Sequence, residues 1–278
     1  MKQIVADYTG EGAYHGSTKP KPQKLMNPFG VKETEATTFA KYRNRRAGVF
    51  DTFNATLSRV YREVAQLPVP SQEDIKNDGS TFVWKPFDEA LEEAGPLTKS
   101  VLKKMQKHLI GQKKYCYVDS KIQYFEPGDV PVDSRHYHLD GTIVIRGKFA
   151  EQLGYPLLHD MRARICGESK PPTYLSYQSS THCPTHFVTE PLSIRVPDFI
   201  PNFDEFSETV LASSPTIKPQ PAASIVATDG LSLHSAVSAS EPGWRLWIRV
   251  METDRLVVVN SEVSDCYLST YRTKPVKN

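Results

Sequence analysis

The sequence contains a histidine and an aspartate, His138 and Asp140, in a pattern suited to metal binding. If this segment is extended, the two side chains project from one face, because strand side chains alternate with a period of two. A further histidine, His234, ends another β-prone run 94 residues after Asp140. Two histidines and one carboxylate form a ligand set that leaves one face of an octahedral metal open and is diagnostic of non-haem Fe(II) oxygenases.

A second feature of interest is the pair of arginines that follows His234. Between Gly243 and Val250 the apolar residues alternate as in a strand, which places Arg245 and Arg249 together on the opposite face. An arginine that points into a barrel needs an anion, because a buried unpaired guanidinium is unfavourable by several kcal/mol. A bound dicarboxylate would satisfy this need, and the planar guanidinium suits bidentate contact with a carboxylate.

The segments His138-Leu139-Asp140, Leu233-His234 and Gly243-Trp244-Arg245 together resemble the Fe(II)/2-oxoglutarate-dependent dioxygenases. Members of this superfamily carry a His-x-Asp motif, a distal histidine and, about a dozen residues later, an arginine. Here Arg245 follows His234 by 11 residues, and the spacing is most similar to the phytanoyl-hydroxylase-like branch. The resemblance covers roughly residues 121–250.

The resemblance implies a double-stranded β-helix, or jelly roll, in which His138, Asp140 and His234 bind Fe(II). It implies that Arg245 binds the far carboxylate of 2-oxoglutarate, with Arg249 as the reserve candidate because it shares the strand face. Thr185, in a segment expected to line the active site, is expected to reach this co-substrate. With dioxygen as the second co-substrate, a small organic molecule would be hydroxylated or otherwise oxidised, with release of succinate and carbon dioxide.

Two departures narrow this interpretation. Arg245 is followed by Leu246 and Trp247, so the sequence lacks the Arg-x-Ser pattern typical of the branch that forms penicillins. Asp140 is present, whereas halogenating members of the superfamily lack this carboxylate so that chloride can bind. The sequence therefore favours hydroxylation or another oxidation over halogenation.

The elements that must position these residues form a mainly β chain with helices near its N-terminus. A helical pattern extends from Glu33 to Leu67, where Pro68 and Pro70 end it and Gly48 divides it. A second helical stretch follows Trp84, breaks at Gly95-Pro96 and resumes from Leu97 to Ile110.

Short β-prone runs separated by glycine and proline follow residue 111. These runs are Tyr115–Val118, Ile122–Phe125, Thr142–Ile145, Tyr174–Tyr177, Phe187–Val188, Ser193–Val196, Ser224–Ala227, Trp244–Met251 and Leu256–Val259. The sequence therefore predicts one domain over residues 1–278: an extended arm over 1–34, a helical layer over 35–111, a β core over 112–260 and a tail over 261–278.

Composition excludes several other classes of protein. The 278 residues are 39% hydrophobic and 24% charged, which fits a globular chain, and no apolar stretch is long enough for a transmembrane helix. A net charge of +2 is too small to indicate nucleic-acid binding by itself. The four cysteines form no Cys-x-x-Cys pair, and the first residues lack the apolar run of a signal peptide. We expect a cytoplasmic protein with reduced thiols.

Three other interpretations remain open at this stage. A dioxygenase acting on a nucleic-acid base or a protein side chain would need an open basic groove, whereas a small-molecule enzyme would need a closed pocket lidded by loops around residues 150–172 and 197–222. A catalytically inactive β-barrel binding protein is the non-enzymatic alternative. His182 and His186 have a spacing seen in zinc sites, but Pro184 disfavours the helix that would align them.

Overall fold

A computed structural model describes residues 52–78, 80–131, 137–139, 171–197 and 203–254. The described chain is mainly β, as predicted, and all of its paired strands are antiparallel. Its strands are β1 (Thr52–Leu57), β2 (Tyr61–Gln66), β3 (Phe82–Pro86), β4 (Tyr115–Phe125), β5 (Thr173–Gln178), β6 (Thr185–Val188), β7 (Leu192–Pro197), β8 (Ile217–Pro219), β9 (Ser224–Asp229), β10 (His234–Ala236) and β11 (Gly243–Thr253). Its helices are α2 (Gln72–Asp78), α3 (Phe87–Glu93), α4 (Pro96–Gln106) and α7 (Phe203–Ala212). Among the helices of these ranges, none has the length and apolar character needed to span a membrane.

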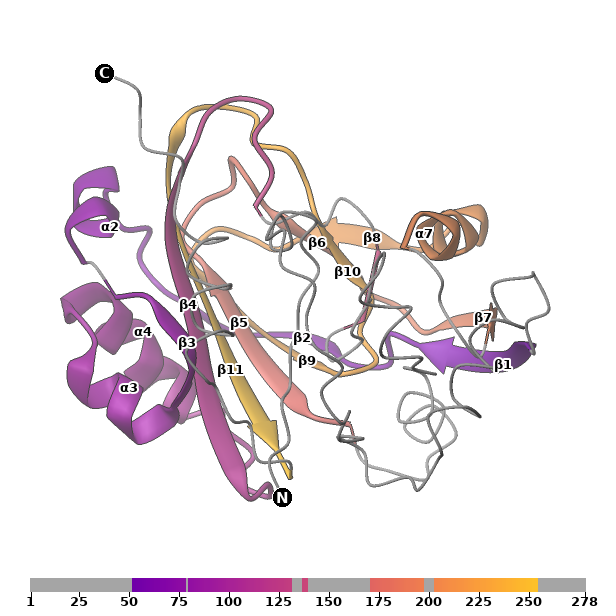
Figure 1. Cartoon of the computed structure of the whole chain (residues 1–278), viewed down its shortest axis with the longest axis horizontal. Coiled ribbons are helices and arrows are strands. Elements are labelled where there is room, and N and C mark those ends of the chain that lie inside the picture. The colour runs from indigo at the N-terminus through magenta and orange to yellow at the C-terminus, as the bar shows by residue number, and fades with distance from the viewer. Residues whose placement is uncertain (1–51, 79, 132–136, 140–170, 198–202, 255–278) are drawn as a thin grey trace, which may run out of the picture.

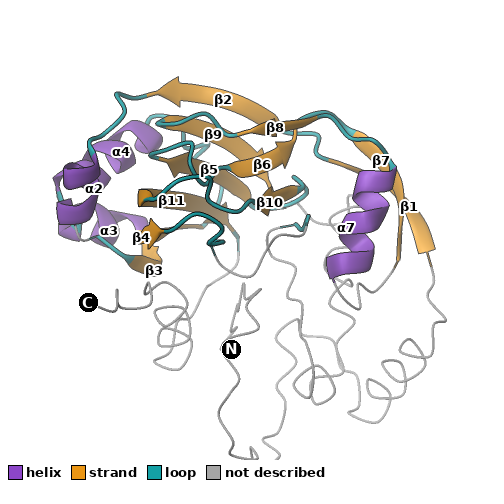
Figure 2. Cartoon of the chain, turned by 90° about the horizontal axis from the view of Figure 1, so that it is seen from above, coloured by secondary structure: helices purple, strands orange, loops and turns teal. Residues whose placement is uncertain are grey.

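The largest sheet of the described chain has six strands in the order β2-β9-β5-β11-β4-β3. A three-stranded sheet has the order β10-β6-β8, and β1 pairs with β7. Helices α2, α3 and α4 cover one face of the six-stranded sheet, whereas β6, β8 and β10 lie on its other side (Figures 1 and 2). The six-stranded sheet therefore has an apolar outer face against helices and an inner face toward the smaller sheet.

Alternation along β11 separates these two faces. Leu246, Ile248 and Val250 are fully or almost fully buried and pack in a hydrophobic cluster with residues of α2, α3 and α4. Arg245 and Arg249 point from the opposite, inner face, as the period of a strand requires. Because the outer face is closed by apolar contacts, the register of β11 cannot slip by one residue without burying both arginines among them.

A second hydrophobic cluster fixes the segment that carries His138. Tyr137 and Leu139 are 5% and 2% exposed and pack with Leu233 and with residues of β1, β7 and α7. The Tyr137 N–H donates to Ser207 Oγ of α7 at 3.1 Å. With both neighbours turned into this cluster, His138 is turned away from it.

The helix predicted over residues 33–67 is wrong in the part that the structure describes. Residues 52–66 form β1 and β2, separated by Ser58, whose φ is +54°. The spacing of the apolar residues does not distinguish the two structures, because residues four apart lie on one face both in a helix and in a strand. Ala55 and Leu57, which are buried, instead follow the period of two.

Other sequence predictions have mixed outcomes. The helical stretch after Trp84 and its break at Gly95-Pro96 are confirmed by α3 and α4, although α4 ends at Gln106 and not at Ile110. Helix α2 was not predicted. The two runs at Tyr115–Val118 and Ile122–Phe125 are one strand, β4, and the loop expected at 197–222 contains α7 and β8. The arm at 1–34, the runs at 142–145 and 256–259 and most of the loop at 150–172 lie outside the described residues.

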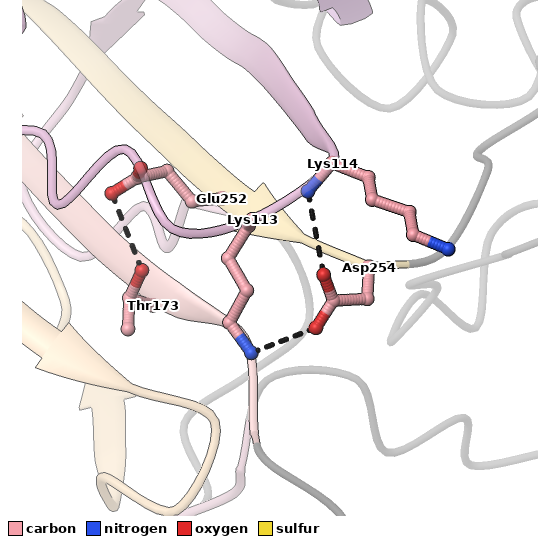
Figure 3. Close-up of polar contacts among 5 residues, drawn as sticks. All are labelled: Lys113, Lys114, Thr173, Glu252 and Asp254. Carbon is pink, nitrogen blue, oxygen red and sulfur yellow. Dashed lines mark hydrogen bonds and ion pairs between the residues drawn. The ribbon is translucent and has the colours of Figure 1, made fainter.

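Acidic side chains fasten the end of β11 to the loop that precedes β4 (Figure 3). Glu252, 5% exposed, accepts hydrogen bonds from the backbone N–H groups of Ile110 and Gly111 at 2.8 and 2.6 Å. Asp254 pairs with Lys113 Nζ at 3.1 Å, and this hydrogen bond lowers the pKa of the Asp254 carboxyl. Glu252 contributes more to stability than Asp254 does, because its buried carboxylate accepts hydrogen bonds from two backbone N–H groups.

We therefore expect Glu252→Ala to lower the free energy of unfolding by about 2–4 kcal/mol, because two backbone N–H groups lose a charged acceptor. Asp254→Ala, which removes an exposed and solvent-screened ion pair, should lower the free energy of unfolding much less. Urea denaturation of both variants measures the difference. Equal losses would contradict the role assigned to Glu252.

Candidate functional site

The structure brings together two histidines that are 96 positions apart in the sequence. His138 forms an isolated antiparallel bridge with His234, the first residue of β10. Each backbone N–H donates to the carbonyl oxygen of the other residue, at 3.0 and 3.1 Å. A directly opposed pair of this kind places both side chains on the same face of the sheet.

The separation of the two imidazoles fits a shared metal ion. Their ring centroids are 4.3 Å apart, with an angle of 55° between the ring planes. A metal–nitrogen bond of about 2.1 Å places a metal about 3 Å from the centre of a ligating imidazole, so two adjacent octahedral ligands have centres about 4.5 Å apart. The observed spacing satisfies this requirement.

The orientation of the His234 imidazole also suits metal binding. Its Nδ1 lies 3.0 Å from the carbonyl oxygen of Ser232. Since a carbonyl oxygen only accepts, Nδ1 carries the hydrogen and Nε2 holds the lone pair. Metal-binding histidines commonly have their other nitrogen bonded to a backbone carbonyl in this way.

The third predicted ligand, Asp140, lies outside the described residues. Within the ranges that the structure describes, no group of three histidine, cysteine, aspartate or glutamate side chains is arranged to hold a metal ion. His138 and His234 are therefore two members of the predicted set, and the assignment of Asp140 stays a prediction.

Arg245 occupies a buried pocket of neutral polar groups. Its Nη2 donates to Gln178 Oε1 at 3.2 Å and to Thr185 Oγ1 at 3.1 Å. Gln178 is held in place, since its Oε1 also accepts from the Thr185 N–H and its Nε2 donates to the Gln220 carbonyl oxygen. The contact with Thr185 joins β11 to β6, and hence the inner faces of the two sheets.

The guanidinium of Arg245 has no negatively charged partner among the described residues. The side chain is 4% exposed, its Nε has no hydrogen-bond partner, and none of the described carboxylates forms an ion pair with it. Burial lowers the pKa of Arg245, which shows how poorly this environment solvates the charge. A site of this kind favours the binding of an anion.

Arg249, four residues along the same strand, has a different environment. Its Nη2 contacts Asp119 Oδ2 of β4 at 3.2 Å, and both side chains are buried. The guanidinium carbon also lies 4.6 Å from the ring centre of Trp84 and 5.2 Å from that of Trp247. The charge of Arg249 is thus balanced within the protein, which distinguishes it from Arg245.

Strand β6 connects the arginine to the histidines. Thr185, which contacts Arg245, and Phe187 share one face of this strand, about 7 Å apart. Phe187 lies opposite His234 in the register, with the two ring centroids 5.6 Å apart. The anion site and the histidine pair are therefore neighbours across the interior between the two sheets.

Sequence patterns did not reveal Gln178 or Tyr61 as parts of this site. Gln178 ends β5 without a motif, and its role follows from the pairing of β5 with β11. Tyr61 was placed in a helix, but in β2 its ring lies 5.5 Å from that of Phe187. Burial and, to a lesser extent, Glu63 raise the pKa of Tyr61 to about 12, so its phenol remains a neutral hydrogen-bond donor near the histidines.

The sequence matches no model of a known protein family, and no curated protein matches it. The functional interpretation therefore depends on the residues and their geometry.

The contrast between the two arginines leads to a stability prediction. Arg249→Met should lower the free energy of unfolding by about 3–5 kcal/mol, because it removes the cation that faces buried Asp119. Arg245→Met should leave the free energy of unfolding unchanged or raise it, because it removes a buried charge that no described carboxylate balances. Thermal and urea unfolding without added ligand measure both. A larger loss in Arg245→Met would contradict the distinction.

Proposed function

We propose that this chain is an Fe(II)- and 2-oxoglutarate-dependent dioxygenase that oxidises a small organic molecule. The observation that carries the proposal is the position of a buried arginine, which no carboxylate of the described ranges pairs with, across the interior from two histidines at metal-binding separation. Both features were expected from the sequence, and the register of β6 accounts for their proximity.

The strand order supports a double-stranded β-helix. From β4 to β6 and again from β8 to β11 the chain alternates between the two sheets: β4, β5, β9 and β11 pair in one, while the His138 bridge, β6, β8 and β10 belong to the other. Between these two series β6 and β8 are neighbours in the same sheet, and β7, which connects them in the chain, pairs with β1. The first strand of the two series, β4, pairs with the last, β11. An eight-stranded jelly roll of two facing sheets has this kind of alternation.

Within this proposal, His138, His234 and Asp140 would hold the metal. Iron held there would supply an electrophilic centre with open positions for 2-oxoglutarate and dioxygen, and the redox chemistry of the oxidation. The residues of the chain bind and orient the reactants. The buried inner face around Phe187 excludes water, and the Ser232 carbonyl holds the His234 ring in one tautomer.

Arg245, with Thr185 beside it, would bind the far carboxylate of 2-oxoglutarate. The five-carbon diacid contains four C–C bonds of about 1.5 Å each, so its length is comparable to the separation of about 7 Å between Thr185 and Phe187 along β6. Arg249 is less suited to this role, because Asp119 already balances its charge. The neutral groups around Arg245 leave its charge available for the incoming anion.

A small-molecule substrate would bind over the inner face beyond Arg245. There the half-buried ring of Trp247 lies 4.9 Å from Lys121 Nζ, and Trp84 and Tyr174 surround the Arg249 guanidinium. This aromatic wall favours a compact polar small molecule. The basic residues of α4 lie on a partly exposed helix face, which fits a solvated surface better than a nucleic-acid groove.

The metal assignment predicts that His138→Ala, His234→Ala and Asp140→Ala each lower Fe(II)-dependent succinate release from 2-oxoglutarate by at least about 100-fold, because each removes a ligand. The assay measures succinate with and without dioxygen across a panel of small organic acids. His186→Ala is the matched control, since His186 lies on β6 beside the site residues but points from the other face of the strand. Unchanged release in the His138 and His234 variants would refute the assignment.

A further inference from the structure

The turn between β5 and β6 carries a buried histidine whose ring is not fully bonded. His182 is 5% exposed, and its Nε2 has no hydrogen-bond partner among the described residues. The same holds for Ser180 Oγ in this turn and for Arg245 Nε. Buried polar atoms are nearly always bonded, so unbonded ones point to a ligand.

Gly243 explains how His182 comes so close to Arg245. A Cβ atom at position 243 would lie 3.3 Å from His182 Cε1 and 3.5 Å from its Nδ1. Residues 243 and 245 share the inner face of β11. A side chain at position 243 would also meet Gln72 Oε1 of α2, at 3.1 Å, so the imidazole and this amide together fill the space, two residues along the strand from Arg245.

The hydrogen bonding of His182 defines its chemistry. The Gly243 backbone raises the pKa of His182, as a nearby carbonyl acceptor does for an imidazole. Nδ1 is the ring nitrogen on the side of Gly243, 3.5 Å from the position of a Cβ there, and Nε2 is the nitrogen without a partner among the described residues. With the hydrogen of the neutral ring on Nδ1, Nε2 has only a lone pair, and it can donate a hydrogen bond only when the ring is an imidazolium.

The surroundings keep His182 neutral before any anion binds. Burial is the largest cause of its lowered pKa, the positive charge of Arg245 lowers it further, and Glu241, in the turn before β11, raises it. Cys183 and Asp129 are further titratable groups near this arginine. Burial raises the pKa of Cys183, Arg245 lowers it to a smaller extent, and Asp129 raises it, so that the net effect is an increase. The cysteine is thus a neutral thiol, and it donates to the Val237 carbonyl oxygen.

We propose that His182 is a second ligand of the carboxylate that Arg245 binds, and that it takes up a proton from solvent as this anion enters. The inference rests on the proposed function, because it takes 2-oxoglutarate as the source of the carboxylate. The anion neutralises Arg245 and gives the new Nε2–H an acceptor, so both changes favour the imidazolium. Nδ1 stays on the side of Gly243, and the ring bridges the backbone and the co-substrate.

Proton uptake can be measured without turnover. The experiment is anaerobic calorimetric titration of 2-oxoglutarate into the Mn(II)-loaded protein near pH 7, in two buffers with different ionisation enthalpies. The variants are His182→Gln, whose amide can donate to a carboxylate without titrating, and the control His186→Gln. Burial also lowers the pKa of His186, but its side chain lies on the face of β6 opposite Thr185.

We expect the wild-type protein and His186→Gln to take up a fraction of a proton approaching one, and His182→Gln to take up none. Equal uptake in His182→Gln and the wild type, or no uptake in the wild type, would overturn the inference about His182. Failure of the wild type to bind 2-oxoglutarate at all would instead overturn the proposed function on which it rests.

A second measurement uses the wild type alone and does not depend on how the variants fold. The affinity for 2-oxoglutarate should rise as the pH falls from 8 to 6, by up to about tenfold per pH unit, because one bound proton accompanies one bound anion. An affinity that is constant or falls over this range would contradict the inference.

Discussion

A buried guanidinium with no opposing carboxylate among the described residues is the constraint on which the rest of this structure depends. Arg245 donates to the amide oxygen of Gln178 and to the hydroxyl of Thr185, and neither neutral group cancels its charge. Such an arrangement is unfavourable for stability unless an anion completes it. Residues that are kept at a cost to stability are typical of functional sites.

The remainder of the fold supplies the rigidity that this site requires. The apolar outer face of the six-stranded sheet, closed by α2, α3 and α4, prevents β11 from shifting its register. Tyr137 and Leu139 hold the histidine segment against the other hydrophobic cluster. Two separate cores thus fix the two halves of one site, and the hydrogen bond between Arg245 and Thr185 joins them.

Sequence patterns predicted those parts of the site that local alternation determines. The shared face of Arg245 and Arg249 follows from the period of β11, and the turn of His138 away from its apolar neighbours follows in the same way. Patterns did not predict that β1 and β2 are strands, because apolar residues four apart fit either periodicity. They also could not show that Asp119 balances Arg249 or that His182 covers Gly243, because these contacts depend on strand pairing and packing between distant segments.

The most direct test of the central claim is an anaerobic crystal structure of the protein with Mn(II) and 2-oxoglutarate. The account predicts a metal bound by His138, Asp140 and His234, and a far carboxylate within hydrogen-bond distance of Arg245 and Thr185. A structure in which the diacid binds elsewhere, or in which a carboxylate of the chain itself pairs with Arg245, would contradict it.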